Sequence, residues 1–251
     1  MISKVFRRFM IAVQFLTTVP IPGNYVREES DLGRSMIFYP MVGLLIGFLT
    51  WGLYSLGSYV VMPVTALSIA LVGNIVLTGG LHLDGFGDMC DGFYAGKDKE
   101  DILRIMKDSH IGTMAVLGLF SLLILKFSLL FALLQEDVLA PALLLTASVG
   151  RWSMSVAAGL FPYARAEGGT AKSFVENVRK RDVVFSSLFM LIISLAVLGP
   201  VGVLISMVSV ATALLFMLWV KKKIGGITGD VLGGLNEISE VCSLAALSAF
   251  L

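Results

Sequence analysis

The chain has 251 residues, of which 57% are hydrophobic and only 15% are charged, and its formal net charge is +1. A soluble domain carries about 25% charged residues, so this composition argues against a soluble domain and favours a lipid-facing surface. The near-neutral charge excludes the basic field typical of nucleic-acid-binding proteins, and two cysteines make neither a disulfide framework nor a zinc pattern.

The apolar segments predict a bundle of membrane-spanning helices. A helix needs about 20 apolar residues to cross a bilayer, so segment 10–22, which ends in Pro-Ile-Pro, is predicted to be interfacial or re-entrant. The predicted spans lie near 36–57, 62–80, 113–134, 138–160, 183–198, 200–220 and 231–251. The last is the weakest because Glu237 and Glu240 lie within it. We therefore predict an all-α polytopic membrane protein with six to seven transmembrane helices and one catalytic domain over residues 1–251.

The positions of the basic residues predict the orientation of these helices. Seventeen of the 19 basic residues lie in 1–35, 81–112, 161–182 and 221–230. The alternate loops, near 58–61, 135–137 and 199, carry none. Because basic loops mark the cytoplasmic side of a membrane, the N-terminus and the three long polar loops are predicted to face the cytoplasm.

The two remaining basic residues, Lys126 and Arg151, lie within predicted spans. An ionisable group inside a membrane is costly and is usually paired or functional. Arg151 either forms a structural ion pair or binds an anionic group of a substrate. For Lys126 we favour snorkelling or structural pairing.

Residues 79–92, Gly-Gly-Leu-His-Leu-Asp-Gly-Phe-Gly-Asp-Met-Cys-Asp-Gly, hold three regularly spaced aspartates. On a helix Asp84, Asp88 and Asp91 share one face, because positions three and four apart are neighbours. Converging carboxylates repel one another unless a cation lies between them, and hard oxygen ligands favour Mg²⁺ or Mn²⁺. Since Mg²⁺ shares its coordination shell with substrate phosphates, we predict a metal site that handles a diphosphate. The alternative is a solvated acidic turn. The glycines are expected to let the backbone approach a bulky ligand.

Both histidines of the chain lie close to these aspartates in sequence. His82 is interpreted as a proton shuttle, a phosphate donor or a structural residue. His110, just before the span that starts near residue 113, is predicted to face the same site.

Two further polar segments complete the predicted site. Asp230 and Glu237 have helical spacing and are predicted to complete the metal shell or orient the nucleophile, with acidic capping of a helix N-terminus as the alternative. Thr228, beside Asp230, is assigned to substrate binding. Arg165 and Glu167 lie in a glycine-containing loop, where Arg165 suits bidentate phosphate contact unless it is only a topogenic charge.

Several of these motifs together carry a family resemblance. They are residues 79–92, the loop 165–169, Thr228 to Asp230 with Gly233-Gly234, Gln14-Phe15-Leu16-Thr17 with Pro20, and Tyr39-Pro40 with Gly43. From about residue 10 to 240 the chain resembles the cobalamin synthase family, the adenosylcobinamide-GDP ribazoletransferases. It departs from the family pattern at Gly87 and Cys90, where alanine or another small residue is expected.

The resemblance implies a reaction, a cofactor and a location. The family joins adenosylcobinamide-GDP to α-ribazole or its 5′-phosphate, giving adenosylcobalamin or its phosphate and GMP, with Mg²⁺, in the bacterial inner membrane. We expect the ribazole 5′-hydroxyl to attack the phosphorus attached to cobinamide, and Asp84 and Asp88 to hold Mg²⁺. Asp91 is then a metal ligand or general base, and His82 is a competing base. Arg165 or Arg151 would neutralise the diphosphate. No nucleic-acid partner is expected, and the oligomeric state stays open.

Two rival functions are compatible with the same broad features. A CDP-alcohol phosphotransferase also uses aspartates on membrane helices with Mg²⁺, but residues 84–88, Asp-Gly-Phe-Gly-Asp, lack the Ala-Arg expected of that motif. In a transporter Arg151 and Glu237 would line a path. However, the acidic cluster lies at one membrane face and the sequence shows no two-half repeat of the kind many transporters have.

Overall fold

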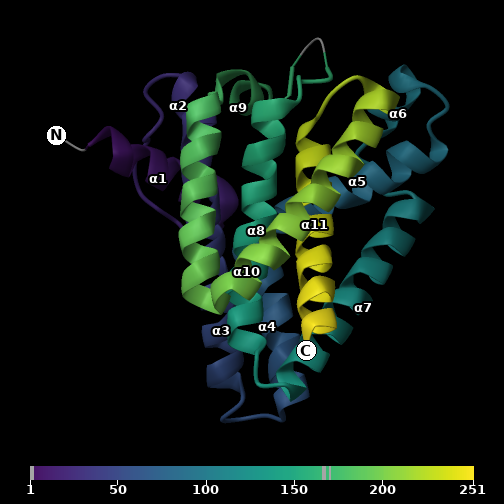
Figure 1. Ribbon diagram of the computed structural model, residues 1–251. Helices are drawn as coiled ribbons and strands as arrows, with labels where there is room; N and C mark the ends of the chain where they lie inside the picture. The colour runs from purple at the N-terminus through teal and green to yellow at the C-terminus, as the bar shows by residue number, and fades with distance from the viewer. Residues whose placement is uncertain (1–2, 166–167, 170) are drawn as a thin grey trace.

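The computed structural model describes residues 3–165, 168–169 and 171–251 (Figure 1). In this part of the chain helices are joined by loops, and one isolated β-bridge, between Tyr163 and Ile227, is the only β-structure. The elements are α1 (Lys4–Leu16), α2 (Ser30–Ser35), the 3₁₀ helix η1 (Met36–Phe38), α3 (Tyr39–Gly57), α4 (Pro63–Thr78), α5 (Leu81–Ala95), α6 (Lys99–Ile105), α7 (Thr113–Gln135), α8 (Leu139–Leu160), α9 (Lys172–Asn177), α10 (Lys180–Ile224) and α11 (Gly229–Phe250). The all-α class predicted from composition is confirmed.

Among the described residues, four helical units are long and apolar enough to cross a membrane: Ser30–Gly57, α7, α8 and α10. The bent pair α4 and α5 makes a fifth if it is counted as one broken span. The prediction of six to seven spans differs in two ways. It counts the two halves of α10 as separate spans, and it includes α11, which carries three carboxylates. Large apolar side chains on α7 and α10, such as Phe120 and Leu215, are exposed as lipid-facing residues must be.

The long helix α10 consists of two arms that meet at a break. Gly199 has φ 59° and ψ −145°, a conformation that glycine adopts because it lacks a Cβ atom. The following residue, Pro200, has no backbone N–H and cannot continue the hydrogen-bond ladder. Figure 1 shows the first arm running down the bundle and the second returning across it. The predicted spans 183–198 and 200–220 are these two arms.

A second break, between α4 and α5, turns the chain by 87° and sets the direction of the aspartate-bearing helix. Gly79 and Gly80 have φ values of +62° and +65°, which a residue with a side chain rarely adopts. The Gly80 N–H donates to the Ile75 carbonyl at 3.0 Å, closing the end of α4. The backbone N–H of Thr18 donates to the Leu77 carbonyl at 2.8 Å, so the segment after α1 also caps α4. The predicted span 62–80 therefore ends at residue 78.

The N-terminal helix is longer at its start than the predicted segment 10–22. α1 begins at Lys4 and ends at Leu16, before the two prolines. Its buried residues, which include Ile11, Ala12 and Leu16, face the bundle, while Phe6 on its first turn is half exposed.

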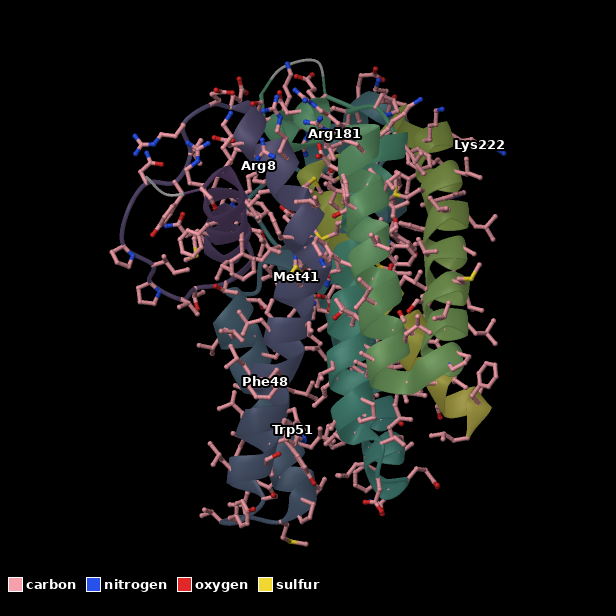
Figure 2. The ribbon with its side chains drawn as sticks, turned by 60° about the vertical axis from the view of Figure 1, so that its left-hand side comes forward. Arg8, Met41, Phe48, Trp51, Arg181 and Lys222 are labelled. Carbon is pink, nitrogen blue, oxygen red and sulfur yellow. The ribbon has the colours of Figure 1, made fainter. Side chains whose placement is uncertain are left out.

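Basic side chains from distant parts of the sequence lie at the same end of the molecule. Figure 2 shows Arg8, Arg181 and Lys222 at one end, whereas Phe48 and Trp51 lie toward the other. The loops that carry the basic residues therefore share one end of the bundle, which we call the basic end.

A buried ion network joins α7, α8 and α11. Lys126 pairs with Glu237 and donates to Glu240 Oε2 at 2.7 Å, and Arg151 pairs with the other oxygen of Glu240. The Nη2 atom of Arg151 lies 3.4 Å from Nδ1 of His82 on α5. The formal charges of the two cations and two carboxylates cancel, as a low-dielectric interior requires. Lys126 pairs structurally, as favoured from sequence, and Arg151 forms the ion pair that was one of its two alternatives.

We predict that Glu240→Gln destabilises the protein by about 3 kcal/mol, because it leaves the buried Arg151 charge without its partner. Thermal unfolding of the detergent-solubilised protein measures the effect as a lower Tm. Asp101→Asn is the control: it breaks an exposed pair with Arg104, so its Tm should match the wild type. Equal Tm values for the wild type and Glu240→Gln would show that the network does not stabilise the fold.

Candidate functional site

The site forms where α5 packs against the first turns of α11. A Cβ atom on Gly85 would lie 2.8 Å from the carbonyl oxygen of Asp230 and 2.9 Å from its Cα atom. A Cβ atom on Gly233 would lie 3.2 Å from the His82 Cα atom. The two helices therefore touch backbone to backbone, which brings Asp84 beside Asp230. The glycines of residues 79–92 were expected to admit a bulky ligand, but Gly85 instead admits the neighbouring helix.

Two loops are joined at the basic end and hold the remaining polar residues. The Ala164 N–H donates to the Ile227 carbonyl at 2.8 Å, and the Ile227 N–H donates to the Pro162 carbonyl at 2.9 Å. This bridge ties the loop after α8 to the loop before α11. It places Arg165 next to Asp230, although 65 residues separate them in the sequence.

Asp230 is held on both sides by polar neighbours. Arg165 Nη2 donates to Asp230 Oδ2 at 2.9 Å, and the Thr228 hydroxyl donates to the same oxygen at 3.2 Å. The Thr228 hydroxyl also accepts from the Val231 N–H at 3.2 Å, so it caps α11. Thr228 is fully buried, so in this structure it positions Asp230. Glu167, predicted to bind substrate, lies outside the described residues.

The three aspartates of α5 have different surroundings. Asp84 is exposed and Asp88 is partly buried, and neither side chain receives a hydrogen bond or ion pair from the described residues. Both oxygens of Asp91 are occupied, because the Gly112 N–H donates to one at 2.7 Å and the Ala115 N–H donates to the other at 2.9 Å. Asp91 therefore caps the start of α7, a task that the helical spacing alone did not indicate.

The charge balance of this cluster favours a cation. Asp84, Asp91 and Asp230 all act electrostatically on Asp88, and the opposing positive charge is that of Arg165. Within the described part of the chain, no three His, Cys, Asp or Glu side chains converge closely enough to hold a metal ion by themselves. Mg²⁺ commonly uses only one or two carboxylates and takes its other ligands from water and substrate phosphates, so the free carboxylates of Asp84 and Asp88 fit that ion.

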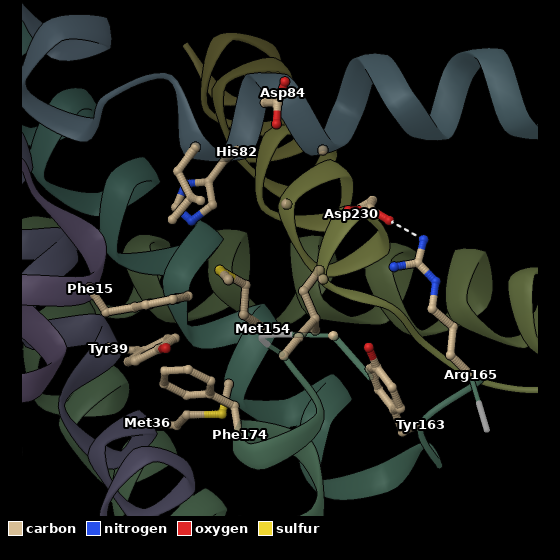
Figure 3. Close-up of a pocket in the computed structure, with 17 residues that line it drawn as sticks. Phe15, Met36, Tyr39, His82, Asp84, Met154, Tyr163, Arg165, Phe174 and Asp230 are labelled. Atoms are coloured by element: carbon tan, nitrogen blue, oxygen red, sulfur yellow. Dashed lines mark hydrogen bonds and ion pairs between the residues drawn. The ribbon is translucent and has the colours of Figure 1, made fainter. Parts of the chain in front are cut away.

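A cavity of about 290 Å³ opens beside this cluster and has two chemically different ends (Figure 3). Its polar end is lined by His82, Asp84, Tyr163, Arg165 and Asp230. Its other end is lined by Phe15, Met36, Tyr39, Met154 and Phe174. The Tyr163 hydroxyl donates to the Gly168 carbonyl at 3.2 Å. Burial raises the pKa of Tyr163, so this hydroxyl stays protonated.

A second cavity, of about 320 Å³, lies on the other side of the aspartates. It is lined by Asp84, Asp88, Lys107 and His110, so Asp84 borders both cavities. His110 Nδ1 lies 2.6 Å from Asp108 Oδ1, and both side chains are largely exposed.

His82 connects the first cavity with the buried ion network. It is 3% exposed, and its Nε2 atom has no hydrogen-bond partner in the described structure. Since a guanidinium can only donate, the contact with Arg151 makes Nδ1 the acceptor, and the neutral ring then carries its proton on Nε2. With its proton on Nε2, His82 is better suited to donate a hydrogen bond to a phosphate than to accept a proton as a general base.

The other predicted site residues lie behind the cavities. Arg151 and Glu237 belong to the ion network and line neither cavity. Sequence reasoning treated Glu240 only as a charge that weakens a span, although it pairs with both buried cations. Glu240 lies three residues after Glu237 on one helix, and this spacing indicates that the two carboxylates share a face.

Comparison with known proteins identifies the family. The family model described as cobalamin-5-phosphate synthase matches residues 8–248. The chain belongs to this family. The adenosylcobinamide-GDP ribazoletransferase of Clostridium tetani is 37% identical over 251 residues, covering 99% of this chain and 98% of that protein. The proteins of the same name from Acetivibrio thermocellus and Chlorobium phaeobacteroides are 37% and 38% identical, covering 98% and 94% of this chain and 99% and 94% of theirs. No solved structure matches the chain.

Membership of the cobalamin-5-phosphate synthase family confirms the resemblance inferred from the motifs. The matched residues 8–248 contain α5, the loop after α8 and the start of α11. All the residues that line the two cavities therefore lie inside the family match.

We predict that Gly85→Ala abolishes most of the activity, because the added Cβ atom would push α5 away from the backbone of Asp230. Gly87→Ala on the same helix is the matched control, since its Cβ atom would lie 3.4 Å from the side chains of Ala115 and Leu119, an ordinary contact. Turnover by purified protein, with Tm as a check on folding, compares the two. Full activity in Gly85→Ala would show that the close approach of α5 and α11 is not required.

Proposed function

We propose that this member of the cobalamin-5-phosphate synthase family is an adenosylcobinamide-GDP ribazoletransferase. It transfers the adenosylcobinamide-phosphate group of adenosylcobinamide-GDP to α-ribazole or its 5′-phosphate, and GMP leaves. The reaction belongs to late cobalamin biosynthesis. The observation that carries the proposal is the near full-length similarity to relatives of that name. The acidic site between two cavities supports it, because the reaction brings together two substrates.

The proposed location is the bacterial inner membrane, with the basic end in the cytoplasm. The grouping of Arg8, Arg181 and Lys222 at one end supports this orientation, since basic loops are retained on the cytoplasmic side. Nucleotide substrates are cytoplasmic, and both cavities are lined in part by loop residues that lie at the basic end, Arg165 in the first and Lys107 in the second.

Asp84 and Asp88 are the proposed Mg²⁺ ligands, with Asp230 close by. A bound Mg²⁺ would neutralise the diphosphate and hold it in place, which is most of what phosphoryl transfer requires of a catalyst. Arg165, oriented by Asp230, directs its remaining N–H groups toward phosphate oxygens. His82 Nε2–H donates from the floor of the first cavity. His110 and Lys107 line the second cavity, where we place the nucleotide end of the donor.

The family description names a 5-phosphate product, and this product requires a different nucleophile from the 5′-hydroxyl expected from the sequence. A product with a phosphate at its 5 position requires an acceptor whose 5′ oxygen is already esterified, so the 5′-hydroxyl expected from sequence cannot attack. We propose that another ribose hydroxyl attacks the phosphorus attached to cobinamide. The bond from that phosphorus to the bridging oxygen breaks, and GMP leaves with this oxygen. The proton of the hydroxyl goes to the Asp84–Asp88 carboxylate pair, because both oxygens of Asp91 are occupied.

The test is product analysis with the full-length protein in membranes. With adenosylcobinamide-GDP, α-ribazole and Mg²⁺ we predict equal amounts of GMP and adenosylcobalamin. Asp88→Asn should lower the rate at least about 100-fold, because it removes a charged ligand of the proposed Mg²⁺, which would neutralise the diphosphate. The rate of the wild type should fall on chelation and return with Mg²⁺.

Asp101→Asn, at an exposed carboxylate on α6, serves as the control and should keep the wild-type rate. No GMP from the wild-type protein would overturn the proposed function. An active Asp88→Asn enzyme with ordinary Mg²⁺ dependence would overturn the metal assignment and leave the function in place.

A further inference from the structure

The non-polar end of the first cavity is a cluster of aromatic and methionine side chains. The rings of Phe15 and Tyr39 are stacked, with centroids 6.5 Å apart and an angle of 18° between their planes. The ring of Phe174 lies 4.4 Å from that of Phe15. Figure 3 shows these three rings grouped at one side of the cavity, with Tyr163 and Arg165 at the other. Such a wall suits a flat aromatic ligand.

Two polar atoms on buried side chains that line the first cavity have no hydrogen-bond partner among the described residues. Tyr39 is 1% exposed, and its hydroxyl makes no hydrogen bond with any described residue. The Nε2 atom of His82 likewise has no hydrogen-bond partner within the part of the chain that the structure describes. Buried polar groups in folded proteins are nearly always hydrogen-bonded, so the Nε2 atom of His82 points to a ligand that completes it. The Tyr39 side chain lines the same cavity, where its hydroxyl can donate to that ligand.

The size and polarity of the cavity indicate which chemical group of the two substrates it can hold. A volume of about 290 Å³ accommodates a nucleoside-sized group, whereas a corrinoid is several times larger. A guanine base carries donors and acceptors along one edge, and most would stay unpaired against phenylalanine and methionine side chains. The benzimidazole base of α-ribazole is apolar except for one unsubstituted ring nitrogen, an acceptor.

We propose that this aromatic end binds the benzimidazole base of the acceptor nucleoside, and that the Tyr39 hydroxyl donates a hydrogen bond to its free ring nitrogen. The proposal rests on the proposed function and adds the location of the second substrate. With the base at the aromatic end, the ribose lies toward His82 and Asp84. The attacking hydroxyl then faces the carboxylates that border both cavities.

The first experiment compares α-ribazole with an analogue that has indole in place of benzimidazole and therefore lacks the free ring nitrogen. For the wild-type enzyme the KM for the analogue should be about tenfold higher, the loss expected for one hydrogen bond. Tyr39→Phe should raise the KM for α-ribazole by a similar factor and remove the difference between the two acceptors. The KM for adenosylcobinamide-GDP should not change in this variant.

A second variant tests the stacking wall independently of the hydroxyl. Phe174→Leu should raise the KM for both acceptors about tenfold. Phe185→Leu, at a half-exposed phenylalanine on α10, is the matched control and should keep both KM values.

The outcomes separate this inference from the proposed function. Equal KM values for both acceptors in the wild type, or a higher KM for the donor alone in Tyr39→Phe, would overturn the base assignment while GMP is still formed. Absence of GMP in the wild type would instead overturn the proposed function.

Discussion

The contact between α5 and α11 is the constraint on which the site depends. A glycine at position 85 lets the backbone of α5 rest directly on Asp230. The two sets of carboxylates then lie close together, although they repel one another. A side chain at Gly85 would separate the helices and relieve that repulsion. The helix packing therefore enforces a concentration of negative charge that the electrostatics of the site alone would oppose, and the proposed Mg²⁺ would relieve this repulsion.

The charges of the molecule divide into a neutral buried network, which supports the helices, and an acidic cluster at the cavities, where the reaction is proposed. Behind α5, Lys126 and Arg151 are matched by Glu237 and Glu240, so the buried network is neutral. On the cavity side the carboxylates outnumber the cation, and the excess is available to a ligand. His82 lies between the two regions, with one ring nitrogen toward Arg151 and the other without a partner in the described residues. A balanced interior can thus hold a charged site at the membrane surface without an uncompensated charge in the bundle.

Asp84 lines several cavities, and the two that also contain cationic side chains fit a reaction with two substrates. One cavity joins an aromatic wall to Arg165 and Asp230, and the other brings Lys107 and His110 to the same aspartate. A transfer between two bound molecules depends mainly on holding them in line. In the proposed arrangement each substrate occupies its own cavity, and the reacting groups of both lie next to Asp84.

The sequence by itself determined the all-α class, the break in the apolar pattern at residue 199, and the helical spacing of Asp84 and Asp88. These are local properties, set by hydropathy, backbone sterics and the helical repeat. Only the tertiary structure decided that Asp91 caps α7, that Arg151 and Glu237 lie behind the cavities, and that Tyr39 lines one of them. Each of these depends on which helices pack together, and pairing over long sequence distances leaves no periodic signal in a single chain.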